Sequence, residues 1–391
     1  MTTTELETIA VAAGFDAVGV ATAVRAPHAD AFLGWLGMGF HASMDWMASE
    51  PERRCRPDLV LPGARSVIVL AMNYFTPDAN GARFSPVGAT SNSPGQASAP
   101  PWVLEKMEDC PEWAASQNAI NIEAFSAAPL PPGGNAARGR IARYARGRDY
   151  HNLIPKRLKK FDEALAAEGG RQRCYADSGP LLERDFAVLA GIAWHGKSTM
   201  ALHPKLGPWF FLAAVITTLE IEAGTPMRDH CGNCTRCIDA CPTSAIVAPH
   251  KVDARRCLSY WTIEHEGPLP DWIRPLLGDR IFGCDDCLDA CPWNRFAVAS
   301  REASFAVRPA SRWPLRDYLA VDEEGFRKLF EGSPIRRAGR QGFLRNVCTA
   351  LGNVGTLDDL PALERCRSDT DPVVAEHAAW ATERIPGLTR R

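Results

Sequence analysis

The sequence predicts an α+β fold with three parts: an N-terminal α/β domain, a central cysteine-rich domain and a C-terminal helical domain. Strand-like apolar runs alternate with amphipathic helical patterns in the first part, eight of the 13 cysteines cluster in the second, and apolar residues recur at helical spacing in the third. A chain of 391 residues is also longer than one hydrophobic core usually spans. We therefore expect domains at residues 1–227, 228–297 and 298–391.

The N-terminal domain is expected to alternate helices and strands. Residues 5–13 look helical, and Gly14 is placed to end that helix. Residues 152–168 form an amphipathic helix, whose apolar face is built by Ile154, Leu158, Phe161 and Leu165. The apolar runs expected to form buried strands cover residues 15–20, 66–72 and 209–217.

Residues 76–137 break this alternation. They are rich in Pro, Gly, Ser, Ala and Asn and show little periodicity, which indicates a long, flexible surface insertion. The alternative is a lid over a functional site, because long loops sometimes serve as lids.

The C-terminal part reads as a short, HEAT-like helical repeat. Phe343, Val347 and Leu351 share one helix face, while Asp371 and Pro372 are suited to begin a second helix. That second helix presents Val374, Ala378, Ala381 and Ile385. Two such units cannot bury a core alone, so we expect them to pack on the preceding domain.

Charge and hydropathy narrow the class of protein. The net charge is −2, so any affinity for nucleic acid has to come from local basic patches. No run of about 18 apolar residues occurs, and no membrane span is expected. The N-terminal sequence MTTTELETIAVAAG lacks the basic and apolar regions of an export signal, which predicts a cytoplasmic protein.

The central cysteines follow the spacing of bacterial iron–sulfur proteins. The run Cys231-Gly-Asn-Cys234-Thr-Arg-Cys237-Ile-Asp-Ala-Cys241-Pro242 is C-x2-C-x2-C-x3-C-P, in which the fourth cysteine ligates the other cluster. The second run is Cys284-Asp-Asp-Cys287-Leu-Asp-Ala-Cys291-Pro292. It lacks a first cysteine, because Ile281 stands at that position, and Cys257 is the remaining cysteine of the region.

We therefore predict two [4Fe–4S] clusters that pass single electrons. The first is bound by Cys231, Cys234, Cys237 and Cys291, and the second by Cys257, Cys284, Cys287 and Cys241. Zinc also uses C-x2-C pairs, but the crossed Cys-Pro duplicates favour iron–sulfur. Five other cysteines are expected to be inert, buried thiols: Cys55, Cys110, Cys174, Cys348 and Cys366.

Local motifs do not name a further cofactor. No G-x-G-x-x-G and no G-x-S-x-G is present. Residues 191–198 match the letters of the phosphate loop, but a helix is expected before them where that motif requires a strand.

Several segments resemble the epoxyqueuosine reductase family. They are Pro51–Arg54 with Leu61–Val67, Tyr144–His151, Asp177–Arg184, Ala190–Ile192 leading to Gly196-Lys197, and the cysteine module including Cys257. The resemblance extends to the helical tail and covers nearly the whole chain apart from the insertion.

This resemblance implies a cobalamin bound between the α/β domain and the cluster domain. The implied reaction reduces epoxyqueuosine at the wobble position of tRNA to queuosine, with two electrons and two protons consumed and water released. A reduced flavodoxin- or ferredoxin-type protein is the expected electron donor, and a monomer is the expected state. The D-x-H-x-x-G motif of other cobalamin proteins is absent, because Asp149-Tyr150-His151 lacks the following glycine.

The same resemblance assigns roles to single residues. Asp177 matches the family's proton donor, which an apolar site can keep protonated. The alternative is that Asp177 or Ser178 caps a helix expected at residues 180–190. Arg54 matches a cobalamin-contacting position, although a surface arginine is the ordinary alternative, and Ser259 and Asp285 are expected near the corrin. Ala142 stands where some relatives carry a cysteine.

Two basic stretches, residues 138–160 and 327–345, are candidates for the tRNA backbone. Solvated helix faces are the alternative. In the second stretch the predicted contacts are Arg336, Arg337, Arg340 and Arg345.

Two other functions fit part of the sequence. A cobalamin-dependent reductive dehalogenase would share the clusters, but such enzymes usually carry a twin-arginine signal and no helical tail. A ferredoxin-type electron carrier would leave the residues before the clusters without a role.

Overall fold

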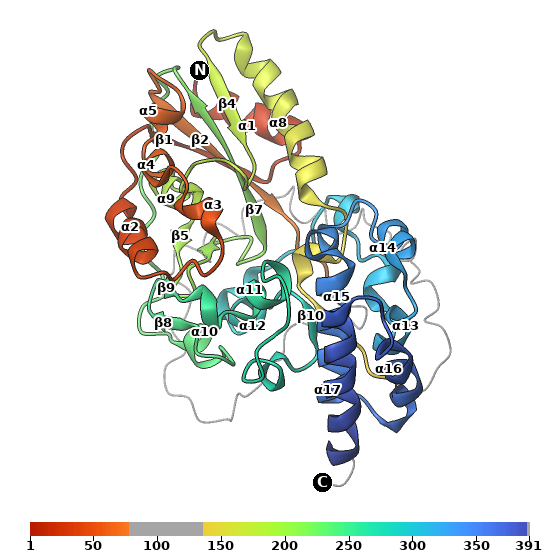
Figure 1. The fold of residues 1–391 in the computed structure, drawn as a ribbon. Coiled ribbons are helices and arrows are strands. Elements are labelled where there is room, and N and C mark those ends of the chain that lie inside the picture. The colour runs from red at the N-terminus through yellow and green to blue at the C-terminus, as the bar shows by residue number, and fades with distance from the viewer. Residues whose placement is uncertain (78–135, 389–391) are drawn as a thin grey trace. The chain divides into compact units, whose positions relative to one another are not determined.

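The computed structural model describes residues 1–77 and 136–388 (Figure 1). The insertion expected at residues 76–137 lies outside these residues except at its two ends. Its predicted flexibility and its possible role as a lid therefore stay predictions.

A four-stranded antiparallel sheet lies in the N-terminal part (Figure 1). Its strand order is β1 (Ala17–Thr22), β2 (Ser66–Asn73), β7 (Phe210–Thr217) and β4 (Gln172–Tyr175). Every residue of β2 is buried, as a strand with neighbours at both edges requires. The strands expected at 66–72 and 209–217 are confirmed, whereas the first strand begins only at Ala17.

Helices pack on this sheet and on each other. Helix α1 (Thr3–Ala13) begins with a capping box and ends at Gly14, whose φ of 93° glycine adopts without strain. Helix α8 (Tyr150–Ala166) contacts α1, and its Phe161 meets Phe15 edge-on, with ring centroids 6.4 Å apart. Phe15 is thereby held in the core just before β1 begins.

Helix α9 (Glu183–Leu189) covers one face of the sheet. Its Phe186 packs in one cluster with Val67 and Val69 of β2, which alternation places on the same face. This contact fixes the loop that precedes α9. Shorter elements complete the N-terminal part: α2 (Ala29–Gly37), α3 (Asp45–Ala48), α4 (Pro51–Cys55), α5 (Pro57–Val60), β3 (Arg140–Ile141), β5 (Trp194–His195) and β6 (Ala201–Leu202).

The cysteine-rich part is built from short elements. They are α10 (Arg236–Asp239), β8 (Ile246–Ala248), β9 (Lys251–Val252), α11 (Leu258–Ile263), β10 (Arg280–Phe282) and α12 (Asp286–Asp289). Helices α10 and α12, one from each cysteine run, contact each other. Strand β10 pairs in parallel with β3, which joins this part to the segment before α8.

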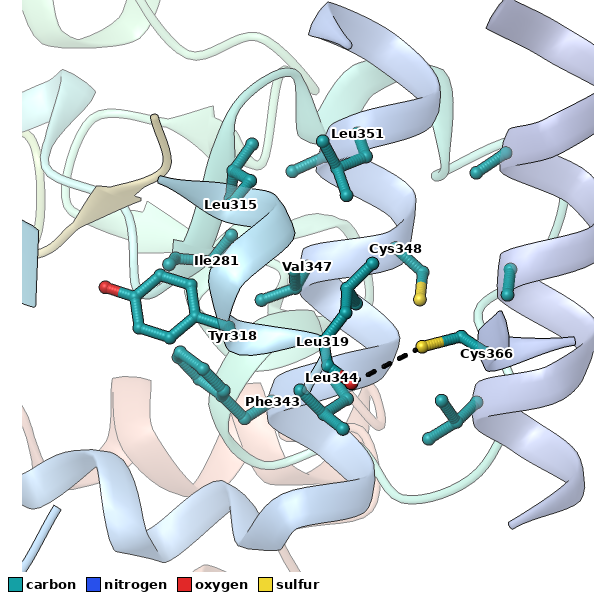
Figure 2. Packing of buried hydrophobic residues seen from close by; sticks show 14 of the residues in the cluster. Ile281, Leu315, Tyr318, Leu319, Phe343, Leu344, Val347, Cys348, Leu351 and Cys366 are labelled. Carbon is teal, nitrogen blue, oxygen red and sulfur yellow. Dashed lines mark hydrogen bonds between the residues drawn. The ribbon is translucent and has the colours of Figure 1, made fainter. Parts of the chain in front are cut away.

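The C-terminal part is helical, and its core is shared with the preceding part of the chain, because Ile281 and Phe282 of β10 belong to the same cluster (Figure 2). Its helices are α13 (Leu315–Tyr318), α14 (Glu323–Leu329), α15 (Gly339–Val354), α16 (Leu360–Cys366) and α17 (Pro372–Leu388). Asp371 caps α17, because its carboxylate accepts from the backbone N–H of Val373 and of Val374. The two predicted helix faces are buried against each other, since α15 packs along α17. The HEAT-like character of these helices stays a prediction.

Among the described residues, no helix combines the length and the apolar composition that crossing a membrane requires.

Candidate functional site

The eight central cysteines gather into two groups. We call Cys231, Cys234, Cys237 and Cys291 the first cysteine group. Burial raises the pKa of the Cys291 thiol to about 12, and the nearby thiols of Cys231, Cys237 and Cys234 raise it further. Cys291 follows α12, so its proximity to three cysteines around α10 shows that the two runs cross.

Cys257, Cys284, Cys287 and Cys241 form the second cysteine group. Burial raises the pKa of the Cys257 thiol, and the nearby thiol of Cys241 raises it further. Burial likewise raises the pKa of Cys287 well above its ordinary value, and Cys284 and Cys257 add to this. The distant Cys257 therefore lies where the spacing of the second run predicts its missing member, although ligation itself stays a prediction.

The surroundings of both groups suit sulfur-ligated metal centres. Burial opposes free thiolates here, so a cation is needed to hold several of them together. Backbone amides supply hydrogen bonds to sulfur: the N–H of Ala245 donates to Cys241 Sγ at 3.1 Å, and the N–H groups of Tyr260 and Ser259 point at Cys257. Such N–H···S bonds tune the potentials of iron–sulfur clusters.

Ser259 and Asp285 lie at the second cysteine group. The Ser259 hydroxyl donates to the backbone carbonyl of Cys284 at 3.4 Å. The Asp285 carboxylate accepts from the backbone N–H of Arg143 at 2.7 Å, and burial raises its pKa. Beside them, Ala142 packs against Gly283, where an added Cβ would approach the Ala142 Cβ to 2.6 Å. Ala142 therefore presents a methyl group beside the second cysteine group.

Arg54 supports the loop that carries Asp177. Its guanidinium lies over the Trp46 ring at 5.4 Å and donates to the carbonyl oxygens of Gly179 and Trp46. Its backbone carbonyl accepts from the N–H of Leu182. The buried Nε of Arg54 has no hydrogen-bond partner among the described residues, so one donor remains for a bound polar group.

Asp177 lies in the loop between β4 and α9 and has a φ of +62°, which is uncommon outside glycine. Its Oδ2 accepts from the Tyr150 hydroxyl at 2.5 Å and lies 3.4 Å from His151 Nε2. Neither Asp177 nor Ser178 caps α9, because Leu182 occupies the N-cap position. The capping alternative is therefore wrong, and the strained backbone aims this carboxylate at the start of α8.

The protonation of Asp177 differs from the expectation. Burial alone would raise its pKa, but hydrogen bonds from His151 and Tyr150 outweigh burial and lower the pKa of Asp177. Hydrogen bonds to Asp149 and Asp177 raise the pKa of His151 to about 9. At neutral pH the proton therefore resides on His151, between two carboxylates, and Asp177 is ionised in this structure.

Three neighbours of Asp177 were not singled out from the sequence. Tyr150 and His151 begin α8, and Tyr150 is fixed by stacking on Phe211 with ring centroids 4.2 Å apart. Glu183 begins α9, and burial, reinforced by Asp177, raises its pKa to about 8. The signal for Tyr150 and His151 was their place in the segment Tyr144–His151, whereas no sequence pattern marks Glu183 as buried.

The predicted tRNA contacts separate into three environments. Arg336 and Arg337 are exposed, and Arg337 pairs with Glu264 at 3.1 Å. Arg340 is half-buried and pairs with Asp369 at 2.6 Å. Arg345 is only 1% exposed, and its guanidinium donates to backbone carbonyl oxygens in the core, so the prediction of an RNA contact is wrong for Arg345.

Much of the other basic stretch, residues 138–160, has structural roles. Arg140 pairs with Asp279 at 2.6 Å, and Arg157 pairs with Glu302 at 2.7 Å. Arg143 is buried. The scattered cysteines are buried at Cys55, Cys348 and Cys366 and half-buried at Cys174, while Cys110 lies outside the described residues.

Comparison with known proteins gives matches along nearly the whole chain. A family profile described as "4Fe-4S double cluster binding domain" matches residues 230–294, and one described as "Epoxyqueuosine reductase QueG, DUF1730" matches residues 119–178. An epoxyqueuosine reductase of Xanthomonas campestris is 39% identical over 96% of this chain and 94% of that protein. The epoxyqueuosine reductase of Escherichia coli is 36% identical over 94% of this chain and 85% of that protein.

Solved structures agree with these matches. A crystal structure of selenomethionine-labelled epoxyqueuosine reductase superimposes with a TM-score of 0.79 at 27% identity, covering 99% of this chain and 92% of that chain. An epoxyqueuosine reductase bound to an epoxyqueuosine-modified tRNA-Tyr stem loop has the same TM-score and identity, covering 99% and 91%. The similarity spans both cysteine groups and the Asp177 loop, and the chain belongs to the epoxyqueuosine reductase family.

Proposed function

We propose that this chain reduces epoxyqueuosine in tRNA to queuosine, with electrons that pass through two [4Fe–4S] clusters to a cobalamin. The observation that carries the proposal is similarity to epoxyqueuosine reductases over nearly the full length of both proteins. It favours this activity over a reductive dehalogenase and over a simple electron carrier, because neither would match along the whole chain. The reaction breaks two C–O bonds of the epoxide, forms a C=C bond and releases the oxygen as water.

The residues around Asp177 are suited to deliver protons to the departing oxygen. That oxygen gains negative charge as the epoxide opens, so a nearby proton donor lowers the barrier. His151 holds a proton 3.4 Å from Asp177 Oδ2, and the Tyr150 hydroxyl donates to the same oxygen atom. We propose that Asp177 faces the substrate and receives its proton from this pair. A solved relative from Bacillus subtilis has its catalytic aspartate loop swung out of the active site, which supports a mobile aspartate in this role.

Arg54, Ser259 and Asp285 are the residues proposed to hold the cobalamin. Their fit rests on the free donor at the buried Nε of Arg54 and on the polar groups of Ser259 and Asp285 beside the second cysteine group. When bound, a cobalamin supplies a strongly reducing cobalt centre. The chain's own contribution would be to hold that group with Arg54 at the Asp177 loop and with Ser259 and Asp285 beside the second cysteine group.

The tRNA backbone is proposed to contact Arg336 and Arg337, which are exposed. Arg340 stays in the proposal as a weaker contact, because Asp369 already neutralises it. A flavodoxin- or ferredoxin-type donor, a monomeric state, a cytoplasmic location and the HEAT-like repeat also remain proposals.

Anaerobic purification with metal analysis tests the cofactor content. We expect about eight iron atoms and matching acid-labile sulfide per chain, with about one cobalt atom after cobalamin is supplied. Zinc in place of iron, or the absence of sulfide, would contradict the proposal of two clusters and of an electron path through them. Iron without cobalt would support the two clusters and contradict the proposal that this chain binds cobalamin.

A further inference from the structure

Two histidines and one aspartate that belong to neither cysteine group lie close together. His28 stands at the start of α2, Asp185 lies in α9 and His195 lies in β5. One ligand atom from each residue lies within 4.8 Å of the other two. Imidazole nitrogens and carboxylate oxygens are the protein ligands that zinc and similar divalent ions accept.

His195 is oriented as a metal ligand would be. Its Nε2 lies 3.2 Å from the carbonyl oxygen of Thr199, which can only accept, so the ring proton is on Nε2. The buried Nδ1 has no hydrogen-bond partner among the residues that the structure describes. An Nδ1 atom without a proton keeps its lone pair for a metal ion. A backbone carbonyl that fixes the tautomer is typical of metal-bound histidine.

Asp185 supplies the negative charge. Its side chain is only 4% exposed, and its Oδ1 lies 2.8 Å from His28 Nδ1. Its Oδ2 accepts from the backbone N–H of His28, also at 2.8 Å. Oδ2 can keep that bond while Oδ1 turns to a cation. His28 itself is 54% exposed and can move without disturbing the core.

We propose that His28, Asp185 and His195 bind one divalent transition-metal ion, for which Zn²⁺ is the best match. Zn–N and Zn–O bonds of about 2.0–2.2 Å place tetrahedral ligand atoms about 3.3 Å apart. The His28–Asp185 contact therefore has to open by about half an ångström, which the exposed His28 allows. Two imidazoles and a carboxylate leave the fourth position open, as in known zinc sites.

Among the described residues, His250 lies next to His195 and is a candidate for the fourth position. Its ring centroid lies 5.9 Å from that of His195, and its Nδ1 lies 3.1 Å from the carbonyl oxygen of Gly196. Because a carbonyl oxygen can only accept, that contact places a ring proton on Nδ1, and Nε2 is the nitrogen that could bind a metal ion. His250 follows β8, so a shared ion would join the cysteine-rich part to α9 and to the loop before α2. The ion would thereby hold the helix that follows the Asp177 loop.

Zinc titration of the cluster-loaded holoprotein tests this site. Equilibrium dialysis against ZnCl2 with metal analysis should give one zinc per chain. Zinc-edge X-ray absorption should show nitrogen or oxygen ligands at about 2.0–2.1 Å and no sulfur at about 2.3 Å. Iron content and circular dichroism check that each preparation keeps its clusters and fold.

Variants of the proposed ligands test whether the bound zinc ion occupies this site. His28→Ala should weaken zinc binding by more than about tenfold and keep the fold, because the side chain is largely exposed. Asp185→Asn should also weaken zinc binding by more than about tenfold. His265→Ala is the matched control, because its Nε2 contacts the carbonyl oxygen of Pro268 and it lies outside the cluster. Wild-type affinity in His28→Ala, sulfur in the zinc shell, or no zinc bound by the wild type would each overturn the proposal.

Discussion

Replacing Arg345 by methionine should destabilise the chain and leave tRNA recognition intact in the protein that remains folded. The guanidinium of Arg345 donates to the carbonyl oxygens of Trp261 at 2.7 Å, Gly267 at 2.7 Å and His265 at 2.9 Å. These contacts hold α11 and the segment that follows it against α15. Methionine keeps the apolar stem of arginine and offers no donor.

The cost follows from these three carbonyl groups and from the buried side-chain oxygen of Asn346, which accepts from the same guanidinium at 3.0 and 3.1 Å. A buried acceptor that loses its partner costs roughly 1–3 kcal/mol. Gly267 and His265 are half-buried, so water relieves part of this cost and the sum is about 3–5 kcal/mol. At about 2 °C per kcal/mol for a domain of this size, Arg345→Met should lower the Tm by about 6–10 °C.

The assay compares Arg345→Met with Arg336→Met, whose arginine is exposed. Anaerobic thermal melts followed by circular dichroism give the Tm, and tRNA binding at several salt concentrations gives the salt slope. Arg336→Met should keep the wild-type Tm and reduce the salt slope by about one unit. A wild-type Tm together with lost tRNA affinity in Arg345→Met would refute the structural role of Arg345.

Four further outcomes are expected. Asp177→Asn should abolish conversion of epoxyqueuosine with wild-type iron content, because an amide cannot take a proton from His151 or Tyr150 and pass it on; near-normal conversion would exclude Asp177 as the acid. Turnover should fall as pH rises through about 9, where His151 loses its proton. The stability that His151 gains from its ion pairs should be complete below the ordinary histidine pKa of 6.5 and should be lost as pH rises through about 9. A turnover rate that stays constant from pH 7 to about 10 would contradict this. Cys257→Ala should lower iron from about eight to about four atoms per chain, and unchanged iron would remove Cys257 as a ligand. Glu183→Gln should raise the Tm relative to wild type at pH 8 and not near pH 4.5. Burial raises the pKa of Glu183 to about 8, so ionisation of this carboxyl group destabilises the folded protein as pH rises from 4.5 to 8. Equal Tm values of variant and wild type at pH 8 would show that ionised Glu183 does not destabilise the fold.

Apolar patterns predicted the elements that have neighbours on both sides. Residues 67–72 of β2 form a continuous apolar run, and all eight residues of the strand are buried. Helical spacing predicted the apolar face of α8, and its four residues are buried: Ile154, Leu158, Phe161 and Leu165. Cysteine spacing predicted the grouping because ligands of one cluster must lie within a few residues of each other or cross between runs.

Charge patterns predicted less, because they do not reveal burial. Arg345 lies in a basic stretch, yet it faces carbonyl groups of residues about 80 positions earlier, which no local pattern shows. The ionised state of Asp177 depends on Tyr150 and His151, which only the folded chain brings to it. The pairing of His28 with Asp185 is likewise a product of the fold, across 157 positions.

Nucleoside analysis of tRNA after incubation with the anaerobic, cluster- and cobalamin-loaded protein and a chemical reductant tests the assigned activity most directly. Mass spectrometry of the digested tRNA should show epoxyqueuosine replaced by queuosine, a loss of one oxygen atom, in proportion to enzyme and time. Unchanged epoxyqueuosine with a protein that holds both clusters and cobalamin would contradict the account.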